Sequence, residues 1–180
     1  MFEKLRIWWK IKRADYVIML DGRPGADKDT LLKIMKGEGF DENGQESKTA
    51  VEKIMLNLEE KRCYIYNTAG AKGETGKKSK ARDKLPKRKT LWIEVFDMGE
   101  YDKRNNITHI SLAKEIQGRY EEARERGFEF LAFGTHLDTN KDKRERIKND
   151  LEGKRIRVVF YELSKNPQKE IIERIKALYS

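Results

Sequence analysis

The stretch 16-YVIMLDGRPGADKDTLL-32 decides the fold. An apolar run typical of a strand leads into a turn rich in Gly and Pro, and the turn leads into an apolar pattern with the period of a helix. In this arrangement the backbone N–H groups of the turn can surround phosphate oxygens, and a Lys at the helix start neutralises their charge. The stretch therefore predicts a phosphate-binding loop between a strand and a helix.

This loop departs from the Walker A motif G-x-x-x-x-G-K-[ST] at two positions. Gly22 and Lys28 have the required separation, but Asp27 replaces the second Gly, and Asp29 replaces the hydroxyl residue, with Thr30 displaced by one. A carboxylate about 4 Å from a phosphate charge would repel it by about 4 kcal/mol at an effective dielectric constant of 20. We therefore expect a degenerate site with weak or absent nucleotide binding.

The composition predicts one folded domain with a strongly charged surface. The chain has 180 residues, of which 37% are hydrophobic and 39% charged, and its mean hydropathy is −0.88. Recurrent apolar runs favour a folded chain over a disordered one, and the Lys and Glu enrichment is typical of thermophiles. The single cysteine, Cys63, excludes an internal disulfide. No apolar run is long enough to cross a bilayer, so we expect a cytoplasmic protein, with peripheral membrane attachment as a variant.

The net charge of +9 is concentrated in two segments. Lys72–Lys89 carries a net +7, and the Trp-rich segment Met1–Arg13 carries a net +4, so the remainder is slightly negative. We expect residues 14–180 to form a single domain, in which residues 67–89 are a basic loop insertion. Both basic segments are candidates to contact nucleic acid, an anionic membrane surface or an acidic protein partner. Residues 1–13 fit either an element packed on the domain or an amphipathic interfacial segment.

Apolar patterns along the chain predict strands that alternate with helices. The expected strands are 16–20, 63–66, 90–98, a short one at 107–111, 128–133 and 156–161. The expected helices are 29–36, 50–61, 112–126, 141–151 and 168–178. This alternation predicts an α/β fold of three layers, with a mostly parallel sheet and helices on both faces.

Polar residues recur where the predicted strands end. Besides the loop at Gly22, these positions include Asp97, the run Thr135–Asp138 and Ser164. The carboxyl ends of parallel strands share one edge of the sheet, and ligands bind there. We therefore expect these side chains to gather around one site.

Over roughly residues 14–180, four stretches in order resemble the Ras/Arf-like small GTPases, which have the P-loop NTPase fold. GRPGADKDT (22–30) is similar to the phosphate loop, and FDMGE (96–100) is similar to the WDxGG motif of Arf-type members. THLD (135–138) resembles NKxD in the THxD form found notably in Roc-type domains, and ELSK (162–165) is similar to the loop that closes over the base.

The resemblance implies GTP or GDP with Mg²⁺ as the ligands. It implies that Asp138 accepts hydrogen bonds from guanine, and that Asp97 holds Mg²⁺ through water together with the residue at the hydroxyl position, Asp29. Gly99 would approach the γ-phosphate. The full set of residues implied to bind the nucleotide is Gly22, Gly25, Lys28, Asp29, Thr30, Gly99, Thr135, His136, Asp138, Ser164 and Lys165.

The resemblance is weakest at the residues that would hydrolyse GTP. Glu100 stands where the family has a second Gly, and Tyr101 stands where many members have the water-positioning Gln. Asp97 and Glu100 are therefore the only catalytic candidates. We expect poor hydrolysis and a role as a switch or scaffold for a protein partner.

Three other functions also fit parts of the sequence. In a DNA-handling ATPase of the additional-strand class, Asp97 and Glu100 would be the Walker B carboxylates, and Lys72–Lys89 would contact DNA. A nucleotide kinase would use the run GxPGxxKDT as its phosphate loop. A non-catalytic scaffold would use the fold only to recruit partners. Under all of these, His109 and His136 look too isolated for a metal site or a catalytic pair.

Overall fold

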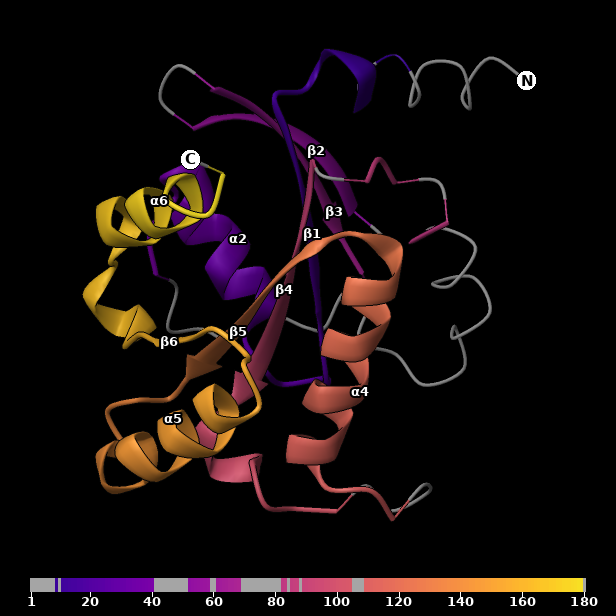
Figure 1. Cartoon of the computed structure of the whole chain (residues 1–180). Coiled ribbons are helices and arrows are strands. Elements are labelled where there is room, and N and C mark those ends of the chain that lie inside the picture. Colours follow the sequence, from indigo (N-terminus) through magenta and orange to yellow (C-terminus); the bar gives the residue numbers. More distant parts are fainter. Residues whose placement is uncertain are drawn as a thin grey trace.

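The computed structural model describes residues 9, 11–40, 52–58, 61–68, 82–83, 85–87, 89–104 and 109–179. Its strands are β1 (Tyr16–Gly22), β2 (Glu52–Leu58), β3 (Lys61–Asn67), β4 (Thr90–Asp97), β5 (Glu129–Thr135) and β6 (Val158–Phe160). Its helices are α2 (Lys28–Lys36), α4 (Leu112–Arg126), α5 (Arg144–Gly153) and α6 (Gln168–Lys176) (Figure 1). Short 3-10 helices are η1 (Met98–Glu100), η2 (Lys141–Lys143) and η3 (Leu163–Lys165).

The strands form one six-stranded sheet in the order β2-β3-β1-β4-β5-β6. β2 is antiparallel to β3, and every other neighbouring pair is parallel. The expected α/β fold with a mostly parallel sheet is confirmed. The phosphate-loop strand β1 lies inside the sheet, hydrogen-bonded to β3 on one side and to β4 on the other.

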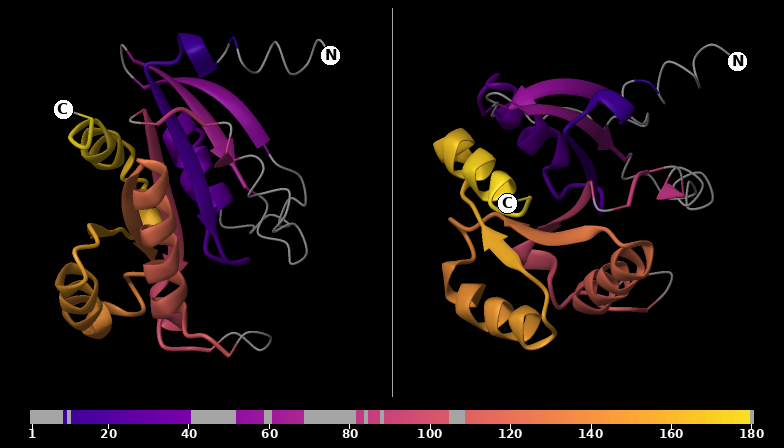
Figure 2. Two further views of the ribbon diagram at one scale, coloured as in Figure 1. Left: turned by 45° about the vertical axis from the view of Figure 1, so that its right-hand side comes forward. Right: turned by 45° about the horizontal axis from the view of Figure 1, so that its top comes forward.

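Apolar side chains cover both faces of the sheet. Along β1, Val17 and Met19 belong to a core cluster with α4 and α5, whereas Ile18 and Leu20 belong to a cluster with α2 and α6. Alternate residues of a strand point to opposite faces, so the helices form two layers around the sheet (Figure 2). This burial on both faces explains why β1 and β4 read as nearly continuous apolar runs.

The helix expected at residues 50–61 is wrong, because residues 52–58 form strand β2. Ile54 and Leu58 are four residues apart, as on one helix face, but with Leu56 they also occupy alternate positions of a strand. All three side chains pack in the cluster on the α2 side, while Met55 packs on the opposite face. The backbone pairing of β2 with β3, such as Ile54 with Ile65, therefore prevailed over the helical pattern.

The short strand expected at residues 107–111 is also wrong in its described part. Residues 109 and 110 have no regular structure, and Ser111 forms an isolated bridge with Arg104. Ser111 is instead the N-cap of α4, where its hydroxyl accepts a hydrogen bond of 3.4 Å from the amide of Lys114. Ser111 has the extended backbone that is usual for an N-cap, and the chain continues from it into α4 and not along a strand.

The two basic segments lie mostly outside the described residues. In the first, residues 11–13 are helical, and Ile11 packs against the core on the α4 side. In the second, only 82–83, 85–87 and 89 are described, so the expected loop contacts remain predictions. Within the described ranges, no helix has both the length and the apolar character needed to span a bilayer.

Candidate nucleotide-binding site

The ends of four parallel strands meet at one edge of the sheet. Leu20 of β1 pairs with Asn67 of β3, and Gly22 pairs with Val95 of β4. Asp97, at the end of β4, pairs with Thr135, at the end of β5. The loop after β1, Thr68 after β3, and the turns after β4 and β5 are therefore neighbours, as expected from the sequence (Figure 1).

The phosphate loop begins at a position where only glycine fits. Gly22 has a φ of 149°, and a Cβ there would lie 2.1 Å from the carbonyl oxygen of Val95. Gly25 also has a positive φ of 77°, and a Cβ there would meet open space. The loop therefore follows the backbone conformation that the two glycines allow.

Lys28 lies over the loop, at the first position of α2. Its buried ammonium group donates hydrogen bonds to the carbonyl oxygens of Gly22, at 3.1 Å, and Arg23, at 2.9 Å. The N-terminus of a helix adds partial positive charge from its unpaired amides. Together the ammonium group and the helix end can bind an anion.

Asp27 adopts a backbone conformation that most residues avoid. Its φ of 58° and ψ of 29° lie in the left-handed region, which is where a glycine would be favoured. The side chain does not cap α2; its Oδ2 lies 3.2 Å from Nε2 of His136. Burial raises the pKa of Asp27, and the neighbouring His136 opposes this rise. The carboxylate that replaces the second Gly is therefore engaged by the loop that follows β5.

His136 lies between two carboxylates and is not isolated, contrary to expectation. Its Nδ1 is 3.6 Å from Oδ1 of Asp97, on the side opposite its contact with Asp27. Asp97 also accepts a hydrogen bond of 2.6 Å from the amide of Gly99. These contacts join the phosphate loop to the ends of β4 and β5. Among the described residues, no cluster of three His, Cys, Asp or Glu side chains is suited to hold a metal.

Asp29 contacts Asn67, a residue that no sequence motif places in the site. Its Oδ1 accepts a hydrogen bond of 2.7 Å from Nδ2 of Asn67, whereas Asp97 contacts Gly99 and His136. The side-chain oxygen of Asn67, Oδ1, is buried, and it has no hydrogen-bond partner among the described residues. Asn67 directly follows the predicted strand 63–66. This position at a strand end is the sequence feature that could have indicated a place for Asn67 in the site.

A buried oxygen of this kind can bind a cation or accept a hydrogen bond from a water molecule. Buried polar atoms in proteins are nearly always paired, so an unpaired one calls for an explanation. Carboxylate and amide oxygens are the ligands that Mg²⁺ takes from proteins. Asp29 and Asn67 together are therefore the candidates to hold a magnesium ion at this edge.

The residues expected around the base lie at the same edge but differ in exposure. Thr135 is fully buried, and its hydroxyl donates to the carbonyl oxygen of Phe96 at 3.2 Å, which ties β5 to β4. Asp138 is exposed. The pKa of Lys165 is raised, mainly by its hydrogen bond with Glu162 and to a smaller extent by the Asp138 carboxylate. The loop after β5 and the loop after β6 are therefore electrostatic neighbours.

Ser164 belongs to the same short helix η3 as Lys165. Its hydroxyl donates to Oε1 of Glu162 at 3.3 Å, while the Lys165 ammonium lies 2.8 Å from Oε2 of the same residue. Glu162 therefore holds the two residues that were expected to close over the base.

The residues at the positions expected to take part in GTP hydrolysis form other contacts in the structure. Tyr101 is buried, and its hydroxyl donates to Asp150 at 2.5 Å. Glu100 pairs with Lys103. Thr30 is partly exposed in the first turn of α2. Beside the phosphate loop lies a cavity of about 260 Å³, lined by Arg23, Pro24, Gly25, Ala26, Asp97, Glu100 and Leu112.

The sheet order and the loop after β1 define a P-loop GTPase-like fold. No protein-family model matches the sequence, and no curated protein matches it. Among solved structures, the chain is similar to Methanosarcina barkeri Roco2 RocCORdC bound to GDP, with a TM-score of 0.53 and 20% sequence identity. The similarity covers 91% of this chain and 48% of that chain, so this chain spans about half its length. At this identity the similarity establishes the fold alone.

Proposed function

We propose that this chain binds a guanine nucleotide with Mg²⁺ at the edge formed by these loops, and acts as a switch or scaffold for a protein partner. The observation that carries the proposal is the position of Lys28, held over a loop whose first residue must be glycine. The solved structure that shares the fold contains GDP, which supports a guanine nucleotide as the ligand.

The phosphates would lie on the loop between Gly22 and Lys28. The loop amides and the N-terminal amides of α2 would donate to phosphate oxygens, and Lys28 would neutralise their charge. The contact of Asp27 with His136 keeps that carboxylate engaged, which limits its repulsion of phosphate. We therefore expect binding that is weakened by Asp27 but not abolished.

Mg²⁺ would be held by Asp29 together with the side-chain oxygen of Asn67. This pair replaces the pair of Asp29 with Asp97 that we expected from the sequence. The ion would neutralise charge on the phosphate oxygens when bound. Asp97 would then serve to hold His136 and the turn at Gly99.

Guanine would be selected by Asp138. Its exposed carboxylate can accept hydrogen bonds from the N1–H and N2–H groups of guanine, which adenine does not present in that arrangement. Ser164 and Lys165 would close over the base from η3. Thr135 and His136 would position this loop against β4 and the phosphate loop.

Hydrolysis is expected to be slow or absent. The buried hydroxyl of Tyr101 is bonded to Asp150 and cannot orient an attacking water without leaving the core. Glu100 lines the cavity beside the loop, but its carboxylate is paired with Lys103. A nucleotide-dependent switch or scaffold needs binding, not rapid turnover.

The sheet order argues against the ATPase of the additional-strand class. That class takes its name from a strand inserted next to the phosphate-loop strand, whereas β1 is bonded directly to β4, which ends at Asp97. A role for Asp97 and Glu100 as Walker B carboxylates then loses its structural basis.

The test is calorimetric titration of the purified chain with GDP, GTP and ATP, with and without Mg²⁺. We expect GDP and GTP to bind more tightly than ATP. Lys28→Met should abolish binding, and Lys169→Met, which changes an exposed lysine of α6, should leave it unchanged. Equal affinity for ATP would contradict the guanine assignment, and no binding of any nucleotide would favour the non-catalytic scaffold.

A further inference from the structure

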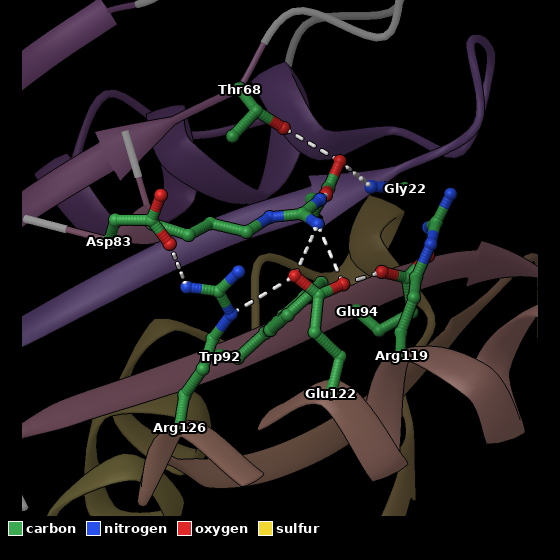
Figure 3. Close-up of polar contacts among 10 residues, drawn as sticks. Gly22, Thr68, Asp83, Trp92, Glu94, Arg119, Glu122 and Arg126 are labelled. Carbon is green, nitrogen blue, oxygen red and sulfur yellow. Dashed lines mark hydrogen bonds and ion pairs between the residues drawn. The ribbon is translucent and has the colours of Figure 1, made fainter. Parts of the chain in front are cut away.

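A buried carboxylate directly precedes the phosphate loop. Asp21 has no exposed surface, yet its Oδ1 accepts hydrogen bonds from the amide of Gly22, at 2.9 Å, and from the hydroxyl of Thr68, at 2.7 Å. Its Oδ2 accepts a bond of 2.6 Å from Arg82 (Figure 3). The Asp21 carboxylate thus connects the first residue of the loop, Gly22, with the end of β3 and with Arg82, which lies 61 residues after Asp21.

Arg82 is held by three kinds of contact. Besides Asp21, its guanidinium donates to both carboxylate oxygens of Glu122, at 3.0 and 2.8 Å, and it lies 4.3 Å from the ring centre of Trp92. Planar guanidinium groups suit such forked and stacked contacts, and a lysine cannot reproduce them fully. Arg82 is counted in the basic segment Lys72–Lys89, but it is largely buried and does not present its charge to an outside partner.

Helix α4 carries a stripe of alternating charges against this network. The α4 stripe consists of Glu115, Arg119, Glu122 and Arg126, spaced so that all four share one helix face. Glu115 pairs with Arg23 of the phosphate loop. Arg119 pairs with Glu94 of β4, Glu122 with Arg82, and Arg126 with Asp83 (Figure 3). One rigid helix therefore contacts the phosphate loop at its first turn and residues 82–83 near its end.

We propose that Arg82 is a positioning residue of the phosphate loop, and that the attachment of residues 82–83 to α4 controls nucleotide affinity. This inference rests on the proposed nucleotide binding. Removal of Arg82 withdraws the guanidinium that donates to Asp21, and loss of a charged hydrogen-bond partner is costly for a buried carboxylate. Asp21 then recruits water or a proton, and its bonds to Gly22 and Thr68 weaken.

The coupling acts in both directions. A ligand that fixes Gly22 also fixes Asp21, and through it the contact with Arg82. By linkage, the effect is reciprocal. A partner that detaches residues 82–83 from α4 lowers the affinity for nucleotide, and bound nucleotide lowers the affinity for that partner by the same factor. The phosphate loop and the start of the segment before β4 thereby form one regulated unit.

The experiment compares GDP affinity in three variants by calorimetric titration. Arg82→Met keeps an apolar stem and removes the charge, and we expect affinity to fall about tenfold, which equals about 1.4 kcal/mol. Arg82→Lys keeps the charge and should recover part of that loss. Arg157→Met is the matched control, because Arg157 forms an exposed pair with Glu129, and affinity should not change.

A second readout separates this inference from the proposed function. Amide hydrogen exchange in the free protein should become faster at Gly22 and Thr68 in Arg82→Met, and remain unchanged along β5. If the unaltered chain binds no GDP, the proposed function fails, but faster exchange at Gly22 still supports the positioning role.

Two results would overturn the inference. One is an Arg82→Met variant with lower stability but unchanged GDP affinity, and the other is unchanged exchange at Gly22. If Arg82→Met does not fold, Glu122→Gln replaces it, because it weakens the second anchor of Arg82 and leaves Asp21 intact. Glu122→Gln should then lower GDP affinity, and unchanged affinity would reject the coupling.

Discussion

The side-chain amide of Asn67 donates a hydrogen bond of 2.7 Å to the carboxylate of Asp29, which joins the end of β3 to the first turn of α2. The contact places beside the phosphate loop one negative charge and one amide oxygen that has no hydrogen-bond partner in the described part of the chain. In the site that we propose, Asn67 takes the place that the sequence assigned to Asp97 as the partner of Asp29. The proposed cation site therefore combines a residue at the end of β3 with one in the first turn of α2.

The first prediction concerns Mg²⁺. Asp29→Asn should remove the gain in GTP affinity that Mg²⁺ gives, because it removes the only formal charge of the Asp29–Asn67 pair. Asp97→Asn should retain most of that gain, since Asp97 contacts Gly99 and His136. The measurement is calorimetric titration of GTP with and without Mg²⁺. The opposite ranking of the two variants would return the metal site to Asp97.

The second prediction concerns Asp27. Asp27→Gly should stabilise the loop, because a left-handed conformation costs a non-glycine residue roughly 1–2 kcal/mol. It should also tighten GDP binding, because it removes a carboxylate near the phosphates. Asp27→Asn separates the two effects, since it removes the charge but keeps a side chain in the same conformation. Urea unfolding and GDP titration measure the two quantities, and weaker binding by Asp27→Gly would show that its contact with His136 is needed.

The third prediction concerns base selection. Asp138→Asn should reduce the preference for GDP over ADP, because the amide presents a donor where the carboxylate accepts. Because Asp138 is exposed, the substitution should leave stability unchanged, and Asp142→Asn, at an exposed position of helix η2, is the matched control. The ratio of the two dissociation constants is the measurement. An unchanged ratio would remove Asp138 from the site.

The sequence predicted the parts of the fold that depend on local patterns. The run 16–32 predicted β1, its loop and α2, and helix α4 ends at Arg126, directly before Gly127, as that glycine indicated. β2 was missed because its apolar spacing fits a helix as well as a strand, and only pairing with β3 distinguishes them.

The polar network beneath the phosphate loop could not be predicted in the same way. Asp21 and Glu94 stand inside apolar strands, and their partners Arg82 and Arg119 lie 61 and 25 residues away. Nothing in the local pattern indicates that such residues meet. The contact of Asp27 with His136 depends likewise on the alignment of two loops across the sheet.

The fourth prediction concerns the start of the loop. Gly22→Ala should lower the free energy of unfolding by roughly 3 kcal/mol, since the new Cβ would lie 2.1 Å from the Val95 carbonyl oxygen and the backbone must shift. Gly118→Ala is the control, because Gly118 lies within α4 with open space around it, and Ala there should stabilise the helix by about 0.5–1 kcal/mol. Urea unfolding measures both. Equal stability of Gly22→Ala and the unaltered chain would show that the loop has a different path.

The fifth prediction concerns the pH dependence of stability. Burial raises the pKa of Glu94 to about 7, although Arg119 opposes this rise, with Asp21 and Lys28 as further charged neighbours. A carboxyl group with a raised pKa in the folded state stabilises the fold while it is protonated. That contribution is complete below the unfolded pKa of about 4.5, and it is lost as pH rises towards 7.

Glu94→Gln removes this titration, because the amide carries no charge at any of these pH values. The unfolding free energy of the unaltered chain, relative to Glu94→Gln, should therefore fall between about pH 4.5 and 7 and stay constant above that range. Each unit of pKa shift corresponds to about 1.4 kcal/mol of this difference. Glu129→Gln, which changes an exposed carboxylate paired with Arg157, should show no such trend. Urea unfolding at several pH values measures the difference, and a constant difference across the range would mean that Glu94 remains ionised beside Arg119.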